Sequence, residues 1–406
     1  MAGNGEELDN FERIDAFIED LQDRNGRYCW PKIKRSPATR EAAMAGIVGE
    51  LEGHHLPLES LDMRCLTIFA LAGVSIKKGN PREACLAYRA VGLLLLTLRD
   101  GSPCPLLDKA FPALSKAIQF PDDGAPLALL TAAIDCLAAA SFAGARRARE
   151  ARRSMETVWR VAMVPARLRS AKPKKTSPVV VAAAVSAWTF LLSIVTFATD
   201  TQQRKKADRT SSWSAAMASL MEMLDADDRR VRMAAGEALA VCAELNFLAD
   251  KDMGALKAKV SDLAAESAGK RADNSLLRQQ QELFGQIAAF LDHGEPPVAS
   301  WEWHDMMKVS TWVRLVQLNF LRKFLGDGFL EHVRGNPLLK EAFSFGRVEG
   351  KPLSIQKERR MSIDELLQNL ERNRDSSWEY GNIVCLPRTY GLNEGLPERL
   401  LQLGWH

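Results

Sequence analysis

Helix starts recur at a nearly fixed interval in the first two thirds of the chain, and this spacing is the strongest constraint on its fold. Apolar helical stretches begin at Ser36, Gly79 and Gly124, which are 43 and 45 residues apart, and others begin at Ser177 and Asp225. A proline follows a small or capping residue at Ser36, Asn80 and Ser177. Proline suits the first helical turn because its missing N–H is not needed there. The spacing therefore predicts a series of related helical units.

Partner helices are expected between these starts, at 58–76 and 105–120. A two-helix unit of about 40–47 residues is typical of armadillo and HEAT repeats, which bury their apolar stripes by stacking on neighbouring units. Alternating strand-like runs are nearly absent from the sequence. The sequence therefore predicts an all-α fold, an armadillo/HEAT-like right-handed α-solenoid with a polar C-terminal tail. An irregular helical bundle is the alternative.

Changes in composition divide the chain into four parts. We expect an N-terminal extension over 1–35 and a helical-repeat domain over 36–292, which contains a basic segment at 145–176. A C-terminal helical block over 293–346 follows, and the tail at 347–406 has one expected short helix at 362–373.

One uncharged segment of 22 residues, at 178–199, is long enough to span a membrane. It is rich in Ala, Ser and Thr, and basic residues flank both of its ends, so it shows no orientation bias. We expect it to be the buried inner helix of a large α-domain, without a membrane partner. A membrane-anchored helical protein is the alternative.

The cysteines and the first residues indicate a reducing compartment. The seven cysteines form no CxxC pair, and the acidic start of the chain has no apolar run of the secretory kind. The expected location is therefore the cytoplasm, with the nucleus as a second one. Four cysteines in apolar helical stretches are expected to be small buried groups: Cys65, Cys85, Cys136 and Cys242.

No catalytic constellation is present in the sequence. It has no nucleophile elbow, phosphate-binding loop, zincin motif or dinucleotide fingerprint. His304 and Asp305 could orient a base, but no nucleophile can be named for them, and Gly326 and Gly328 indicate a turn or helix end. We therefore predict a protein that is not an enzyme and uses no cofactor, metal or small-molecule substrate.

The strongest functional feature is a basic window. Between Arg146 and Lys175, eleven basic and two acidic residues give a net charge of +9, against +3 for the whole chain. Arginine presents a planar fork that matches phosphate oxygens, and counterion release gives affinity for any polyanion. On a helix, the offsets of Arg146, Arg149, Arg153 and Arg160 place them on one face. The eleven candidates are Arg146, Arg147, Arg149, Arg152, Arg153, Arg160, Arg167, Arg169, Lys172, Lys174 and Lys175.

This window predicts contact with the nucleic-acid backbone, because no aromatic ladder accompanies it to read bases. A solvated linker and a nuclear import signal around 172–175 are the alternatives.

A second candidate surface lies in the C-terminal block. The sequence WVRLVQLNFLRKFL places apolar residues at helical spacing, which predicts a buried stripe of Trp312, Leu315, Val316, Phe320 and Leu321. Three basic residues lie outside that stripe and are candidates for phosphate contact: Arg314, Arg322 and Lys323.

The same block resembles the interferon-related developmental regulator family. The matching residues are Trp312, Gln317-Leu318, Phe324-Leu325-Gly326-Asp327-Gly328, His332, Asn336, Leu339 and Phe343. The segments 39–51, 76–98 and 228–245 resemble the helical-repeat blocks of the family, in family order, so the resemblance spans about 36–346. The chain departs from the family in its weakly basic stretch at 275–287 and in its tail after Phe345.

The resemblance implies a non-enzymatic regulator with an armadillo-like fold. Members bind idle 80S ribosomes through ribosomal RNA and proteins, where they occupy the P- and E-site tRNA space, and their C-terminal helix reaches toward the mRNA channel. The block adds His332 and Arg334 to the candidate RNA contacts, and the tail offers Lys351, Lys357, Arg359 and Arg360 for the channel. Members are also nuclear transcriptional co-regulators, so a protein–protein scaffold that binds co-repressor proteins is the alternative.

Overall fold

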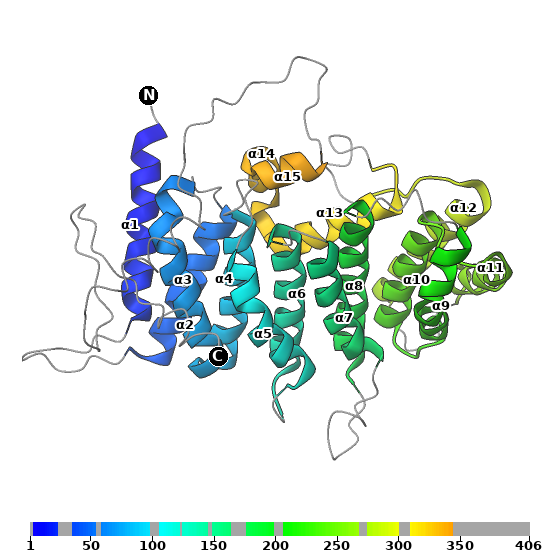
Figure 1. The fold of residues 1–406 in the computed structure, drawn as a ribbon, viewed down its shortest axis with the longest axis horizontal. Coiled ribbons are helices and arrows are strands. Elements are labelled where there is room, and N and C mark those ends of the chain that lie inside the picture. The colour runs from blue at the N-terminus through cyan, green and yellow to red at the C-terminus, as the bar shows by residue number, and fades with distance from the viewer. Residues whose placement is uncertain are drawn as a thin grey trace, which may run out of the picture. The chain divides into compact units, whose positions relative to one another are not determined.

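A computed structural model describes residues 3–22, 35–53, 58–97, 105–121, 124–144, 148–163, 176–198, 206–267, 274–299 and 309–343. Every regular element within these ranges is a helix (Figure 1), which confirms the predicted all-α class. The expected short helix at 362–373 and the rest of the tail lie outside the described residues.

The chain forms two compact units. The first contains the described residues within 1–114, 143–146 and 325–406, and the second contains those within 115–142 and 147–324. Helices of the first unit are α1 (Gly3–Leu21), α2 (Pro37–Gly53), α3 (Leu58–Lys78), α4 (Pro81–Thr97), the turn η4 (Gly326–Gly328), α14 (Phe329–Gly335) and α15 (Pro337–Phe343). Helix α5 (Pro105–Gln119) contributes residues to both units, as do α6 (Leu127–Gly144) and α13 (Trp312–Leu325). The remaining helices of the second unit are α7 (Ala148–Met163), α8 (Pro178–Ala198), α9 (Lys206–Met223), α10 (Arg229–Glu244), α11 (Asp250–Ala264) and α12 (Asn274–His293).

The helices begin where the capping residues predict. Ser36 Oγ accepts a hydrogen bond from the Thr39 N–H at 3.1 Å, before Pro37 opens α2. Asn80 Oδ1 accepts from the Glu83 N–H at 2.9 Å at the start of α4. Each cap satisfies an N–H that has no partner inside its helix, so these residues set the helix starts that the sequence indicates.

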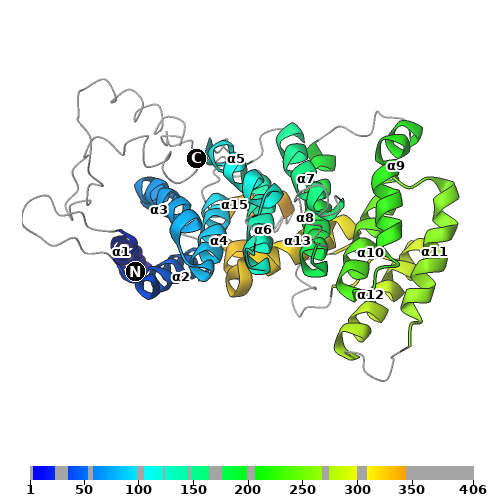
Figure 2. The ribbon, with the colours of Figure 1, turned by 90° about the horizontal axis from the view of Figure 1, so that it is seen from below.

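Within the second unit, helices two apart in the chain pack side by side. Helix α8 lies against α10, and α10 lies against α12, while α7, α9 and α11 pack on this layer (Figure 2). Aromatic rings fill the interface, because Trp188 of α8 lies 4.7 Å from Trp159 and 6.1 Å from Trp213, between ring centroids. This order is the one expected of stacked helix pairs, in which each apolar stripe is buried by its neighbours.

Helix α8 is the uncharged segment that the sequence singled out. Two described helices, α6 and α8, are long and apolar enough to cross a membrane, although the sequence indicated only α8 as such a segment. In each of them 61% of the apolar window is buried against the rest of the protein. Such burial is typical of the core helices of an α-domain and agrees with the buried-helix interpretation.

The cysteine predictions can be checked at four positions. Cys65, Cys136 and Cys242 are buried free thiols, as expected, whereas Cys85 is half-buried. Burial raises the pKa of the Cys242 thiol, so that group stays protonated and inert at neutral pH.

A short glycine-bounded turn joins α13 to α14. Gly326 has φ +59°, which glycine adopts without strain. A Cβ on Gly328 would overlap the carbonyl oxygen of Glu52 at the end of α2, so the two backbones approach too closely for any side chain. The Gly326-Asp327-Gly328 sequence is therefore a helix-to-helix turn, as predicted, and not a phosphate loop.

Two buried polar residues hold α14 and α15 in the first unit. His332 Nε2 is 2.9 Å from the carbonyl oxygen of Leu51, and Asn336 Nδ2 donates to the carbonyl oxygen of Leu96 at 2.9 Å. Asn336 Nδ2 also lies 3.3 Å from His332 Nδ1. These contacts assign the proton to Nε2 and leave Nδ1 as the acceptor, so the neutral imidazole fits this site.

The His332 contacts predict a dependence of stability on pH. Burial lowers the pKa of His332, so the unfolded chain takes up a proton before the folded one as the pH falls below about 6.5. The free energy of unfolding should therefore be highest above that pH and decrease below it, by at most about 1.4 kcal/mol per pH unit. Urea unfolding at several pH values would measure this, and His332→Gln should flatten the profile. Identical profiles for the two proteins would contradict the assignment.

Candidate nucleic-acid interface

Helix α7 carries the described part of the predicted basic window. One side of it is buried, through Ala151, Met155, Val158 and Val161. Ser154 on that side shares a 2.7 Å hydrogen bond with Ser141 of α6, which satisfies both buried hydroxyls. Because the buried positions follow helical spacing, the intervening arginines are directed to the opposite side.

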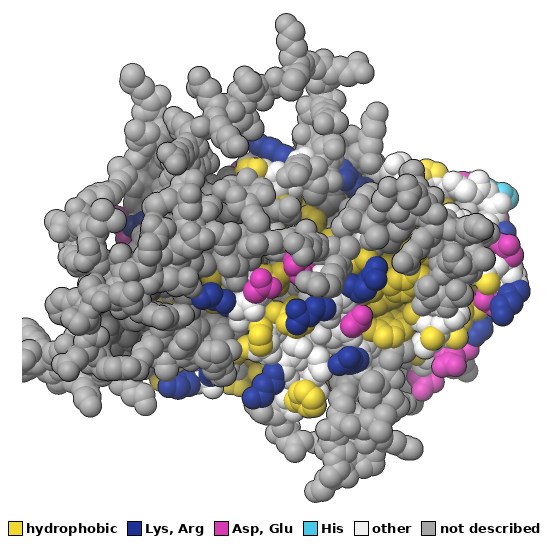
Figure 3. Space-filling view, in the orientation of Figure 1, with side chains coloured by type: hydrophobic (Ala, Val, Ile, Leu, Met, Phe, Trp, Pro, Cys, Tyr) yellow, Lys and Arg dark blue, Asp and Glu magenta, His cyan; other side chains and the backbone are white. Residues whose placement is uncertain are grey.

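Three arginines of α7 are exposed: Arg152, Arg153 and Arg160. Arg160 Nη1 donates to Gln119 Oε1 at the end of α5, at 3.5 Å. Of the two acidic residues of the window, Glu150 is half-buried and Glu156 is exposed. On the face drawn in Figure 3, Lys and Arg side chains are spread among apolar side chains, and acidic ones are fewer in the middle of the view. The exposed side of α7 can present guanidinium groups to a phosphate backbone.

The rest of the basic window lies outside the described side chains. Arg149 lies in α7 at a position where the backbone alone is described. The other candidates lie outside the described residues: Arg146, Arg147, Arg167, Arg169, Lys172, Lys174 and Lys175. The predicted common face is therefore established for Arg153 and Arg160, which are seven residues apart.

Helix α13 holds the second set of candidates. Its predicted apolar stripe is buried, and Phe320 stacks on Phe190 of α8 with ring centroids 4.1 Å apart. The carboxylate of Glu244 accepts from the N–H groups of Trp312 and Val313, at 3.0 and 2.9 Å, and so caps the N-terminus of the helix. These contacts fix the helix on α8 and α10.

The three basic residues of α13 differ in their surroundings. Arg322 is exposed, and Lys323 is exposed and pairs with Asp135 of α6 at 2.9 Å. Arg314 is half-buried, and burial lowers its pKa to about 10, so it keeps its charge at neutral pH. Arg322 and Lys323 are therefore the exposed candidates on this helix, and Arg314 is the less accessible one.

Two other candidates lie in the first unit. The expectation for His332 is wrong, because its side chain is fully buried and hydrogen-bonded to backbone and Asn336. Arg334 is exposed and pairs with Glu331 at 2.9 Å, within its own helix. The tail candidates Lys351, Lys357, Arg359 and Arg360 lie outside the described residues.

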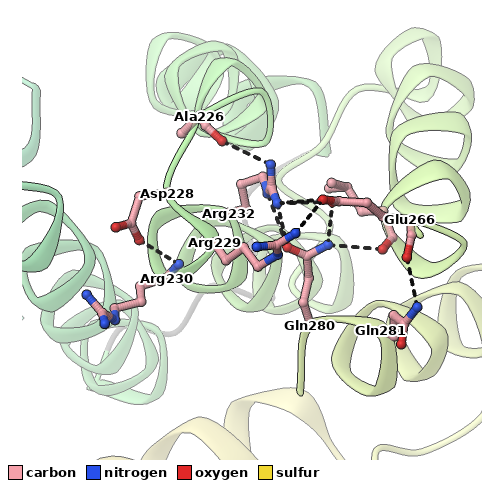
Figure 4. A network of polar contacts seen from close by, with 9 residues as sticks. Ala226, Asp228, Arg229, Arg230, Arg232, Glu266, Gln280 and Gln281 are labelled. Carbon is pink, nitrogen blue, oxygen red and sulfur yellow. Dashed lines mark hydrogen bonds and ion pairs between the residues drawn. The ribbon is translucent and has the colours of Figure 1, made fainter. Parts of the chain in front are cut away.

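Other arginines of the second unit have an internal role that the sequence did not indicate (Figure 4). Arg229 and Arg232 of α10 both donate to the carboxylate of Glu266, at 2.9 and 3.0 Å. Buried Gln280 of α12 donates to the same carboxylate at 2.8 Å and accepts from Arg232 at 2.9 Å. The hydrogen bond from Gln280, together with Arg232 and Arg229, lowers the pKa of Glu266. These arginines join α10, α12 and the segment after α11, so they are not free to bind RNA.

The described residues contain no group of three or more His, Cys, Asp or Glu side chains that could hold a metal ion.

Comparison with known proteins gives a consistent result. Residues 3–292 match the family model described as Interferon-related developmental regulator (IFRD). Interferon-related developmental regulator 2 of Mus musculus is 25% identical over 350 residues, which cover 81% of this chain and 74% of the mouse protein. Interferon-related developmental regulator 1 of Homo sapiens and that of Sus scrofa are each 24% identical over 330 residues, covering 77% of this chain and 69% of each relative.

Substitution of an internal arginine of α10 and of an exposed arginine of α7 should have different effects on stability. Arg232→Ala removes partners from Glu266 and buried Gln280, so it should lower the free energy of unfolding by about 2–4 kcal/mol. Arg152→Ala changes an exposed side chain and should shift it by about 0.5 kcal/mol or less. Urea unfolding of both variants would check this, and equal losses would contradict the distinction.

Proposed function

The chain belongs to the interferon-related developmental regulator family, and from this premise we propose that it is a non-enzymatic regulator of translation that binds idle eukaryotic ribosomes. In this proposal it occupies the P- and E-site tRNA space, as the resemblance implies, and so keeps the ribosome translationally silent. The observation that carries the proposal is the exposed arginine side of α7, formed by Arg152, Arg153 and Arg160.

The proposed mechanism is steric. Stacked helix pairs, which we propose to be an armadillo/HEAT-like right-handed solenoid, fill the space that tRNA would otherwise occupy. Arginine forks on α7 contact phosphate oxygens of ribosomal RNA, because such contacts need no base sequence and suit a folded RNA surface. Arg322 of α13 is the second proposed contact, and Arg314 and Lys323 contribute positive charge beside it. No bond is made or broken, so the proposal requires no cofactor and places the protein in the cytoplasm.

The contacts on α7 predict a salt-dependent affinity for idle 80S particles. Arg152→Ala/Arg153→Ala should weaken binding at least about tenfold and lower the slope of log affinity against log salt by about 1.4–1.8, for two lost phosphate contacts. The measurement is cosedimentation of the purified full chain with idle 80S particles on sucrose gradients at several salt concentrations.

A matched control variant distinguishes a specific contact on α7 from a general loss of positive charge. Arg230→Ala/Arg278→Ala removes the same charge from exposed positions on α10 and α12, and it should retain most of the binding. Equal losses in both variants would argue against α7 as the interface. Sedimentation of the wild-type chain at the top of the gradient at low salt would overturn the proposal. Loss of nuclear accumulation alone in the α7 variant would favour the nuclear co-regulator.

A further inference from the structure

A groove of about 630 Å³ lies within the second unit, away from the arginines of α7. Its lining comes from α6, α8, α10, α12 and α13, together with Val298 of the segment that precedes α13. Helices α8, α10 and α12 lie side by side, so the groove crosses these three neighbouring helices. Neighbouring helix axes are about 8–10 Å apart, so this part of the groove spans about 16–20 Å. That length matches about five to six residues of extended chain.

Each of these three helices contributes side chains to the groove at the same spacing. The first and last lining residues of each helix are seven positions apart. They run from Val179 to Ser186 on α8, from Arg230 to Glu237 on α10 and from Gln279 to Gln286 on α12. Gln286 accepts a hydrogen bond from the Val298 N–H at 2.9 Å, so the groove already binds one non-helical backbone segment. Val298 and Val179 are 63% and 39% exposed at this site, although both are apolar. The lining therefore combines amides for a peptide backbone with uncovered apolar groups.

Glu237 is the unusual member of this lining. Its side chain is half-buried, and its carboxyl group makes no hydrogen bond or ion pair with the part of the chain that the structure describes. Burial raises its pKa to about 7. An unpaired carboxylate on the wall of the groove can accept charge-assisted hydrogen bonds from a cationic side chain of a ligand.

None of the other charged side chains of the groove pairs with Glu237 within the described residues. Lys323 is paired with Asp135, and Arg230 begins the stripe on α10, two helical turns from Glu237. Glu282 of α12 adds a further negative charge. Oδ1 of Asp135 is also buried without a hydrogen-bond partner within the described residues. The lining therefore carries three carboxylates against two cationic side chains, and its net charge of −1 disfavours phosphate and favours a cationic ligand.

We propose that this groove binds an extended basic segment of a partner protein and that Glu237 receives a lysine or arginine side chain of that segment. The long apolar stem of such a side chain packs along the groove wall while its charged head reaches the carboxylate. Gln279 and Gln286 supply hydrogen bonds to the backbone of the segment. This site is distinct from the proposed ribosome interface on α7, because no residue of α7 lines the groove and the ligand is of another class.

The test uses a display library of random twelve-residue peptides, selected on the folded wild-type chain and counter-selected on Glu237→Gln. The enriched peptides should share one fixed Arg or Lys position. A synthetic enriched peptide should lose about 10- to 100-fold in affinity, the loss expected for one charge-assisted contact, when that residue is replaced by neutral citrulline. Binding of the basic peptide should strengthen between pH 6 and pH 8, as Glu237 becomes ionised.

Two variants test whether Glu237 itself recognises the basic residue of the peptide. Glu237→Gln keeps the size of the side chain and should bind the basic and citrulline peptides equally, whereas Arg152→Ala/Arg153→Ala should bind as the wild type does. Enrichment without a fixed basic position would overturn the proposal, as would an unchanged preference in Glu237→Gln. Failure to enrich any peptide on the wild-type chain would also overturn it. Ribosome cosedimentation of Glu237→Gln should match the wild type, so failure of either proposal is recognisable separately.

Discussion

Burial of apolar side chains between successive helices is the interaction on which the rest of the structure depends. Helix α8 shows it most clearly, because it has no charged residue and packs against both α7 and α10. Burying one large apolar side chain contributes about 1.5–3 kcal/mol, and many such side chains are buried along α7, α8 and α10. The same packing decides which side of each helix remains exposed. On α7 it directs Arg152, Arg153 and Arg160 outward, so the proposed interface is a consequence of the core.

Patterns local in sequence predicted the fold well. Pro and capping residues marked the starts of α2, α4 and α8, and helical spacing identified the buried side of α13. These signals act within one helix, so they need no knowledge of its neighbours. The exposure of Arg152 and Arg153 could be predicted in the same way, because their helix is amphipathic.

Contacts between residues far apart in the chain could not be predicted from the sequence. The hydrogen bond between His332 and Leu51 joins residues 281 positions apart, and no local pattern distinguishes this histidine from a surface one. Likewise, the sequence of α10 does not indicate that Arg232 binds Glu266 and Gln280 while Arg230 remains exposed. Glu237 was missed for the same reason, because its lack of a partner depends on four other helices and on the segment at Val298.

We propose that the packed helices of the second unit present the arginines of α7 to folded ribosomal RNA. A cryo-electron microscopy map of the full chain bound to idle 80S particles tests it most directly. The account predicts density for the helical units in the P- and E-site space, with α7 against the RNA backbone and Arg152 and Arg153 within reach of phosphates. A map in which the protein binds elsewhere, or in which α7 faces solvent, would contradict it.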